Sequence, residues 1–410
     1  MENSSQETSK MPLDGLRVIE LGQLIAGPFC GQLMADFGAE VVKVEPPEIG
    51  DAMRQWGRMD EDGKPIWWNV IARGKRSITI DLRQPEGQAI LRDLARKADV
   101  VIENFRPGTL ERWGLGYDVL SGGNPGLILA RVSGFGQDGP YAKRAGYASV
   151  CEAIGGLRHI AGFPDRPPVR AGLSLGDSLA GMNAAMGIMM ALHHRAQTGR
   201  GQVVDSAIFE SVLHMTESLV SDYDAIGHVR ERTGSTLPGL APSNAYPTAD
   251  GRDIIIGANQ DTVFQRLCEV MGQPELANEP AFATHVARGE NAEALDAEIA
   301  SWTSKYKASV LHELLSEGGV PVGLAYTAKE MFEDDHFAAR QSIIRVPDSK
   351  GGDLAMQNVF PKLSETPGSV RRLGPSLGAD TRDVLHHLLG YDREKIKTLA
   401  GHKIIGPEVL

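Results

Sequence analysis

The chain has 410 residues, of which 42% are hydrophobic and 23% charged, a composition typical of soluble globular proteins with room for two or more domains. The formal net charge of -11 argues against a surface for nucleic acid or anionic membranes, so an anionic ligand would need a local cluster of Arg and Lys. Cys30, Cys151 and Cys268 lie far apart, which excludes a disulfide framework and a CxxC metal pair and predicts a reducing compartment.

The amino-terminal end, residues 1–12, is polar and lacks the apolar stretch of a signal peptide, so we predict a flexible tail. The most apolar helical stretch, residues 179–192, is shorter than the roughly 20 residues that cross a bilayer. We therefore expect a cytoplasmic protein that has neither a membrane nor a nucleic acid as partner.

Residues 13–224 alternate between two kinds of segment. Helical patterns such as 27–37 and 86–98 separate runs rich in β-branched residues, which lie at 16–21, 40–45, 77–82, 99–104 and 127–135. This alternation predicts an α/β domain with a largely parallel sheet. Ligands of such sheets gather beyond the carboxyl ends of the strands, so the loops that follow these runs are the candidate site.

The chain changes character after residue 224. Residues 227–251 are polar and rich in Gly and Pro, which is typical of a linker or mobile loop. A strand at 253–258, a helix at 262–271 and an amphipathic helix from about Ala294 then predict a smaller α+β domain, so that 225–330 form a linker and small domain. The remainder, 331–410, holds a Pro-rich stretch and a final helix at 381–390.

Several familiar motifs are incomplete or absent. The stretch GFGQDG at 134–139 matches GxGxxG, but no helix opens within it, so we interpret it as a Gly-rich loop over a site rather than a dinucleotide fingerprint. The histidine pairs at 193–194 and 386–387 have no suitably spaced carboxylate, and we expect no metal site. No hydrolase, zincin or P-loop signature is present.

Cationic side chains cluster in two segments. Residues 72–83 carry four of them, and residues 103–114 combine cations with two aromatic rings; the residues are Arg73, Lys75, Arg76 and Arg83, then Arg106, Arg112, Phe105 and Trp113. The second segment follows a strand, where an adenine ring could stack and Arg could bind phosphates. Solvated surface charge explains the same residues, and both interpretations stay open on this pattern alone.

One carboxylate precedes an apolar segment. Asp177 lies in LGDSLAG, just before the nearly uncharged residues 178–195. Asp favours the N-cap of a helix, where its oxygen accepts a backbone N–H and its charge suits the positive helix end. The same position would expose the carboxylate for chemistry, and this window does not decide between the two.

Taken together, the motifs resemble those of class III CoA-transferases, also called the formyl-CoA transferase or CaiB/BaiF family. The stretches that carry the resemblance cover nearly the whole chain and are PLDGLRVIELGQLIAGPFCGQLMADFGAEVVKVEPP, GKRSITIDL, ENFRPGTLERWGLG, SGFGQDGPYAKRAGY, LGDSLAG and TGRGQVVDSAIFESV. The resemblance implies a large Rossmann-like domain built from both chain ends, with 331–410 returning to it, a smaller domain between them, and an interlocked homodimer.

The resemblance also implies roles for individual residues. Asp177 takes the place of the family's catalytic nucleophile, with no metal and no permanently bound cofactor, since coenzyme A is a substrate. The family's contacts with CoA fall on Ile25, Ala26, Ile80, Leu82, Arg83, Asn104, Phe105, Arg106, Arg112, Trp113 and Tyr147.

The implied reaction moves CoA from an acyl-CoA to a carboxylic acid through an aspartyl anhydride and an aspartyl-CoA thioester. Residues 210–232 and 361–385 are most similar to the enzymes that transfer CoA from succinyl-CoA to malate, which favours a dicarboxylic acceptor. Arg170 or Arg54 is a candidate for binding the second carboxylate. Ile25, Ala26 and Pro46 stand where formyl-CoA transferases carry other residues, which argues against formate and oxalate.

Two alternatives remain at this stage. The α-methylacyl-CoA racemases are similar in fold but use a His base in a GHD pattern, where this chain has Gly146, Tyr147 and Ala148. A non-catalytic CoA-ester-binding protein, with Asp177 as a helix cap only, is the other.

Overall fold

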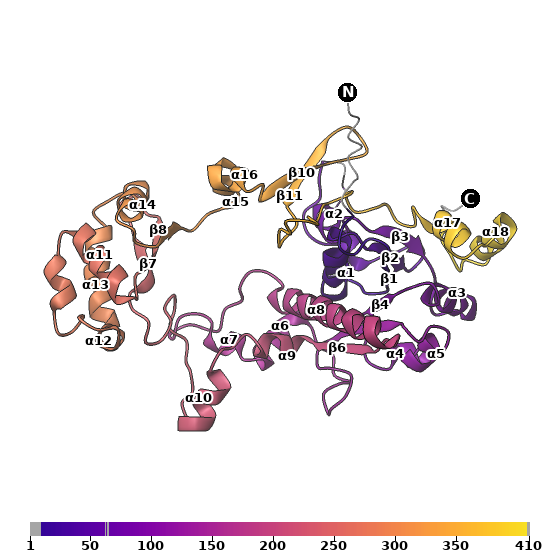
Figure 1. Ribbon diagram of the computed structural model, residues 1–410, viewed down its shortest axis with the longest axis horizontal. Helices are drawn as coiled ribbons and strands as arrows, with labels where there is room; N and C mark the ends of the chain where they lie inside the picture. Colours follow the sequence, from indigo (N-terminus) through magenta and orange to yellow (C-terminus); the bar gives the residue numbers. More distant parts are fainter. Residues whose placement is uncertain (1–9, 62, 64, 408–410) are drawn as a thin grey trace. The chain divides into compact units, whose positions relative to one another are not determined.

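The computed structural model describes residues 10–61, 63 and 65–407, and its central feature is a six-stranded sheet in which every strand runs parallel to its neighbours (Figure 1). The strand order is β3-β2-β1-β4-β5-β6. The strands are β1 (Arg17–Glu20), β2 (Glu40–Glu45), β3 (Arg76–Thr79), β4 (Val100–Glu103), β5 (Ile128–Ser133) and β6 (Val203–Ala207). The predicted α/β class with a parallel sheet is confirmed, whereas nine residues of the predicted tail, 1–9, lie outside the described residues.

Both faces of the sheet are covered, because successive strand residues point to opposite faces. Ile19 and Val101 belong to the core on one face, which also takes side chains from α3 (Pro85–Ala95), α5 (Tyr117–Gly122) and α18 (Arg393–Gly401). Val18 and Val100 belong to the core on the other face, under α1 (Ala26–Asp36) and α8 (Leu175–Thr198). The carboxyl-terminal residues thus pack beside the first strands of the chain.

Helix α8 is longer than the sequence predicted. It has 24 residues, with Ser174 as N-cap and a left-handed Gly199 after its last turn. Among the described residues, it is long and apolar enough to span a membrane by length and composition, so the prediction from residues 179–192 was wrong on length. Its small residues Ala180, Ala184 and Ala191 are buried in the core beneath it.

Helices α1 and α8 approach each other closely at Gly181. A Cβ placed there would lie 2.7 Å from the carbonyl oxygen of Ala26 and 3.2 Å from Cδ1 of Phe29. Only a residue without a side chain allows this contact between the two backbones. Gly181 therefore brings the second turn of α8 against the start of α1.

The chain divides into two compact units. The first unit contains the sheet and comprises the chain up to Leu157, Ala171–Val220 and everything from Arg340; the second comprises Arg158–Arg170 and Ser221–Ala339. Residues 158–170 fall within the range 13–224 that the sequence assigned to the large domain. They join the second unit because Gly162 and Gly234 form a β-bridge and Arg232 donates to the carbonyl of His159.

The second unit is built on a three-stranded antiparallel sheet, β7-β8-β9, whose first strand lies in the predicted linker. Its elements are β7 (Ser243–Pro247), β8 (Asp253–Gly257), α11 (Asp261–Met271), α12 (His285–Glu290), α13 (Ala292–Thr303), α14 (Ala308–Glu317), β9 (Val322–Leu324), α15 (Ala328–Glu333) and α16 (Asp335–Ala339). At its centre the fully buried Arg288 donates to the main-chain carbonyls of Ala241, Phe282 and Asn259 and pairs with Asp261.

The remaining elements of the first unit are short. They are α2 (Ile66–Ile71), α4 (Thr109–Arg112), α6 (Ala148–Ile154), α9 (Ile208–Leu213), the hairpin of β10 (Ile343–Pro347) and β11 (Asp353–Gln357), and α17 (Thr381–Asp383), while α7 (Leu157–Ile160) and α10 (Leu219–Ile226) span the boundaries between the units. The predicted final helix at 381–390 is only α17 followed by a π-helical turn, and α18 comes after it.

We expect Gly181→Ala to lower the free energy of unfolding by about 1–3 kcal/mol, because the new methyl group meets the backbone of α1 and overpacks the contact. Gly122→Ala is the matched control, since a Cβ there meets nothing within 4 Å and alanine favours helices. Chemical denaturation measures both. Equal stability of the two variants would contradict the close contact between α1 and α8.

Candidate active site

The candidate site lies where the strand order reverses. Strands β2 and β4 flank β1. Helix α1, which follows β1, packs on one face of the sheet, whereas α4 and α5, which follow β4, pack on the other. The loop after β1 (residues 21–25) and the loop after β4 (residues 104–108) therefore diverge at the carboxyl edge of the sheet. Ligands of doubly wound folds bind in this crevice.

Asp177 lies in the first turn of α8. The helix begins after Ser174, so Asp177 is the third helical residue and is not the N-cap that the sequence favoured. Its side chain is half-buried, and its negative charge sits at the positive end of the helix dipole. Gly181, one turn further along α8, contacts the carbonyl of Ala26, so Asp177 lies near the start of α1.

Glu152 of α6 supports this turn from behind. It is 1% exposed, and its Oε1 accepts the backbone N–H of Gly176 at 3.1 Å. A Cβ at Gly176 would lie 3.0 Å from Cγ2 of Ile208 and 3.2 Å from Cγ of Glu152. The glycine that precedes Asp177 is thus required by packing.

None of the cysteines is an alternative nucleophile. Burial raises the pKa of the Cys151 thiol to about 11, and the nearby charge of Asp177 adds to this shift. Burial also raises the pKa of Cys30, and it raises that of Cys268 to about 11. All three thiols therefore stay protonated near neutral pH, and all three side chains are buried.

A network of buried charges lies beneath the loop after β1. Lys43 Nζ pairs with Glu20 at 3.0 Å and with Asp51 at 2.8 Å, and Lys75 Nζ pairs with the other oxygen of Glu20 at 2.8 Å. Burial alone would lower the pKa of Lys43, but the charges of Glu20 and Asp51 outweigh it and raise that pKa. The two ammonium groups also donate to the carbonyls of Gly22 and Pro28, each at 2.6 Å.

The cationic segment 72–83 is mostly used in such pairs. Arg73 binds Asp36 at 2.6 Å and is buried, Lys75 binds Glu20, and Arg76 binds Glu40 at 2.8 Å. These three side chains are therefore neither solvated surface charges nor available to bind phosphate. Of the segment's four cations only Arg83 is exposed, and it pairs with Asp81 at 2.8 Å.

Arg54 is also engaged in a salt bridge within the protein. Its guanidinium forms two hydrogen bonds with Glu45, at 2.7 and 2.8 Å, and stacks 3.8 Å from the ring centroid of Trp68. This bidentate, largely buried pairing does not suit Arg54 to a substrate carboxylate, which corrects that prediction.

The residues that the resemblance assigns to CoA all lie in the first unit, at the carboxyl edge of the sheet. Ile25 and Ala26 begin α1, and Tyr147 is the exposed N-cap of α6. Ile80 and Leu82 are buried in the core on the α3 face, so only their main chains are available to a ligand.

The loop after β4 presents aromatic and cationic groups together. The rings of Phe105 and Trp113 meet edge to face at 5.3 Å, while Arg106 and Arg112 are exposed. Glu103 accepts the Phe105 N–H at 2.7 Å and pairs with Arg131, and Arg131 also binds Glu111 of the exposed turn α4. Burial raises the pKa of Glu103 to about 7 despite Arg131.

The side chain of Asn104 faces the protein. Its amide bonds to both backbone groups of Gln23, which joins the loops after β1 and β4. The sequence did not predict this role, nor the charge network. The available signal was charged residues inside apolar strands, such as Glu20 and Lys43.

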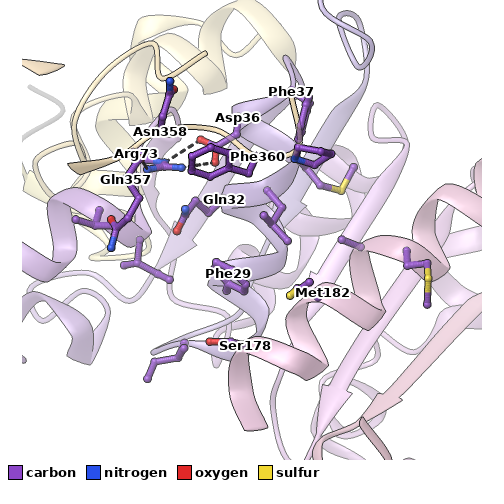
Figure 2. Close-up of a pocket in the computed structure, with 18 of the residues that line it drawn as sticks. Phe29, Gln32, Asp36, Phe37, Arg73, Ser178, Met182, Gln357, Asn358 and Phe360 are labelled. Carbon is purple, nitrogen blue, oxygen red and sulfur yellow. Dashed lines mark hydrogen bonds and ion pairs between the residues drawn. The ribbon is translucent and has the colours of Figure 1, made fainter. Parts of the chain in front are cut away.

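A groove of about 730 Å³ opens between α1, α2 and α8. Figure 2 shows the Asp36–Arg73 pair with Gln357, Asn358 and Phe360 at one end, and Phe29, Met182 and Ser178 at the other. Most of the lining is apolar. Ser174 and Ser178, on either side of Asp177 in the chain, also line it.

No group of three or more His, Cys, Asp or Glu side chains in the described part of the chain could hold a metal ion. The Gly134–Gly139 loop is followed by turns, and the next helix, α6, begins only at Ala148. This arrangement differs from the helix opening that a dinucleotide fingerprint requires.

Comparison with known proteins places the chain in a family. The sequence profile of CoA-transferase family III matches residues 13–381. The chain belongs to this family. It is 57% identical over 401 residues to the succinyl-CoA--D-citramalate CoA-transferase of Chloroflexus aurantiacus, covering 98% of this chain and 100% of that protein.

Two further relatives agree. The beta subunit of the succinyl-CoA--L-malate CoA-transferase of the same organism is 41% identical, with 97% of this chain and 99% of that subunit covered. The crystal structure of a CaiB/BaiF family protein from Brucella suis is 37% identical, with a TM-score of 0.82 over 92% of this chain and 100% of that one. The chain is therefore a class III CoA-transferase, and CoA esters are its substrates.

Proposed function

We propose that this enzyme transfers CoA from succinyl-CoA to a dicarboxylic acid, with Asp177 as the covalent nucleophile. The observation that carries the proposal is the position of Asp177 in the first turn of α8, beside the start of α1 at the carboxyl edge of the sheet. The citramalate and malate transferases at 57% and 41% identity support the choice of substrates.

The proposed reaction balances without a metal, a redox step or net proton transfer. A carboxylate oxygen of Asp177 attacks the thioester carbon, the C–S bond breaks, and CoA thiolate leaves an acyl-aspartyl anhydride. The thiolate attacks the aspartyl carbon and releases succinate, which gives an aspartyl-CoA thioester. The acceptor carboxylate attacks the carbonyl carbon of this thioester, the C–S bond breaks, CoA thiolate leaves, and a second anhydride forms. The thiolate then attacks the acceptor's carbonyl carbon in this anhydride, which gives the new acyl-CoA and releases the Asp177 carboxylate.

The surroundings of Asp177 suit these steps. Its half-buried position limits the access of water, which would hydrolyse the anhydride and the thioester. The first turn of α1 contains no acidic residue and no side-chain cap, so its backbone N–H groups are candidates to stabilise the oxyanion of each attack.

For the CoA moiety, we propose that the adenine ring lies against Phe105 and Trp113. Arg106 of the loop after β4 and Arg112 of α4, both exposed, would meet the phosphates, with Arg83 from the loop after β3. Ile25, Ala26 and Tyr147 would face the pantetheine end, with Ile80 and Leu82 contributing main chain only. Arg170, the other residue that the sequence offered for the second carboxylate of the acid, belongs to the second unit.

The sequence around Tyr147 argues against racemase chemistry. Gly146, Tyr147 and Ala148 provide no His where the racemases carry their base, and the exposed Tyr147 caps α6. In a protein that only binds CoA esters, Asp177 would stay unmodified, and added acceptor acids would not change the bound acyl-CoA.

We expect the enzyme to form a new acyl-CoA from succinyl-CoA when citramalate or malate is supplied. Formate and oxalate should react at least about tenfold more slowly, because Ile25 and Ala26 are apolar where formyl-CoA transferases are polar. Mass spectrometry of the CoA products across a panel of acids measures this. Preference for a monocarboxylic acid would contradict the dicarboxylate proposal.

We expect Asp177→Asn to reduce transfer by at least about 10³-fold, because the amide cannot form the anhydride. Binding of CoA and the unfolding midpoint should stay close to wild type, since Asn keeps the volume of the side chain. Asp118→Asn, at an exposed position of α5, is the control and should retain full activity. Residual transfer by Asp177→Asn above a few per cent of the wild-type rate would rule out Asp177 as the nucleophile.

We also propose that the enzyme is an interlocked cytoplasmic homodimer, with a second copy of the chain covering α8. Met182, Met186 and Met190 lie four residues apart on one side of this helix and are 53%, 50% and 62% exposed. Together with the apolar groove they make a surface that is unusual for a monomer exposed to water.

Met186→Glu should therefore shift the protein from dimer toward monomer, because a charge would be buried in the contact. Val119→Glu, 49% exposed on α5, introduces the same charge on the opposite face of the sheet and should leave the dimer intact. Light scattering after size exclusion measures both. A wild-type protein that is monomeric at micromolar concentration would contradict the dimer.

A further inference from the structure

We propose that Asn104 is a positioning residue whose side chain clamps the loop after β1, so that it shapes the active site instead of binding CoA. The effect on catalysis rests on the function proposed above. The clamp itself stands on the geometry of the loop.

The amide of Asn104 is engaged at both of its polar atoms by one residue. Its Oδ1 accepts the backbone N–H of Gln23 at 2.8 Å, and its Nδ2 donates to the carbonyl of Gln23 at 2.8 Å. This is the pattern of a two-point clamp between residues 81 positions apart, and it joins the loops on either side of the strand-order reversal. A side chain used in this way presents little of its amide to a ligand.

The clamped loop is strained. Leu24 has a φ of 63°, a left-handed conformation that residues other than Gly rarely adopt. Its N–H donates to Asp51 Oδ1 at 3.0 Å, and the carbonyl of Gly22 accepts from Lys43 at 2.6 Å. Such conformations persist only where the surroundings fix them. Here the side chains of Asn104, Asp51 and Lys43 fix the loop through their hydrogen bonds to its main chain.

The strained loop determines where α1 begins. A Cβ at Gly22 would lie 3.2 Å from Oδ1 of Asn104, and one at Gly27 would lie 3.5 Å from its Cβ, so Asn104 packs against both the loop and the first turn of α1. Helix α1 starts at Ala26, whose carbonyl meets α8 at Gly181. Relaxation of the loop would therefore move the start of α1 relative to Asp177.

The test compares Asn104→Ala and Asn104→Asp with Asn124→Ala. Asn124 is a matched control, since its Nδ2 also bridges backbone carbonyls, those of Ala95 and Ala98, away from the site. Asn104→Asp keeps the side-chain volume but turns a carboxylate oxygen toward the carbonyl of Gln23, so it answers the question if Asn104→Ala does not fold. Hydrogen exchange of residues 22–28, the Kd for CoA, and kcat and KM for succinyl-CoA are measured on the full-length protein.

We expect at least about tenfold faster exchange in residues 22–28 and a fall in kcat of about 10- to 100-fold for both Asn104 variants, with Kd for CoA and KM changed less than about threefold. Asn124→Ala should lower the unfolding midpoint but leave this exchange and kcat at wild-type values. A tenfold weaker Kd for CoA with unchanged kcat would make Asn104 a CoA contact and overturn the proposal. Unchanged exchange in residues 22–28 would also overturn it, even if the wild type proved inactive as a transferase.

Discussion

The arrangement of the site depends on charges buried under the loop after β1. Two lysines and their carboxylate partners, Glu20 and Asp51, are almost completely removed from water. Burial of charges is costly unless each one is paired and hydrogen-bonded, and loss of one partner typically costs about 3–5 kcal/mol. Lys43 and Lys75 meet this condition with carboxylates and with the carbonyls of Gly22 and Pro28. The network therefore holds the start of this loop and the first turn of α1.

From this base the site is built through close backbone contacts. Gly181 brings α8 against α1, and Gly176 lets the first turn of α8 pack on Glu152 and Ile208. Close packing of the main chain thus fixes the turn of α8 that carries Asp177. The proposed nucleophile, which would pass through anhydride, thioester and free carboxylate, benefits from such a rigid base.

The sequence predicted the parallel sheet well because apolar, β-branched runs are a local signal. All five runs identified in residues 13–135 overlap strands β1 to β5. The predicted helix at 179–192 was too short because its ends contain small and polar residues, which a hydrophobic pattern does not count. Asp177 was expected at the N-cap because Asp favours that place, whereas Ser174, which shares this preference, is the residue that begins the helix.

The sequence did not predict the partners of the charged residues. Arg54, Arg73 and Lys75 looked available for anionic ligands, yet their acids, Glu45, Asp36 and Glu20, lie on other elements of the fold. Such pairs depend on tertiary contacts, which no local pattern encodes. The site residues came from motif resemblance, and the structure places them at one edge of the sheet, while their roles toward CoA and the acid stay predictions.

The most direct test of the central claim is to identify the residue that becomes covalently modified during turnover. The protein is incubated with succinyl-CoA, trapped with hydroxylamine, digested and analysed by peptide mass spectrometry. We expect a hydroxamate at Asp177 that appears only when succinyl-CoA is present. Absence of any adduct in an active wild-type enzyme, or an adduct on a different carboxylate, would contradict it.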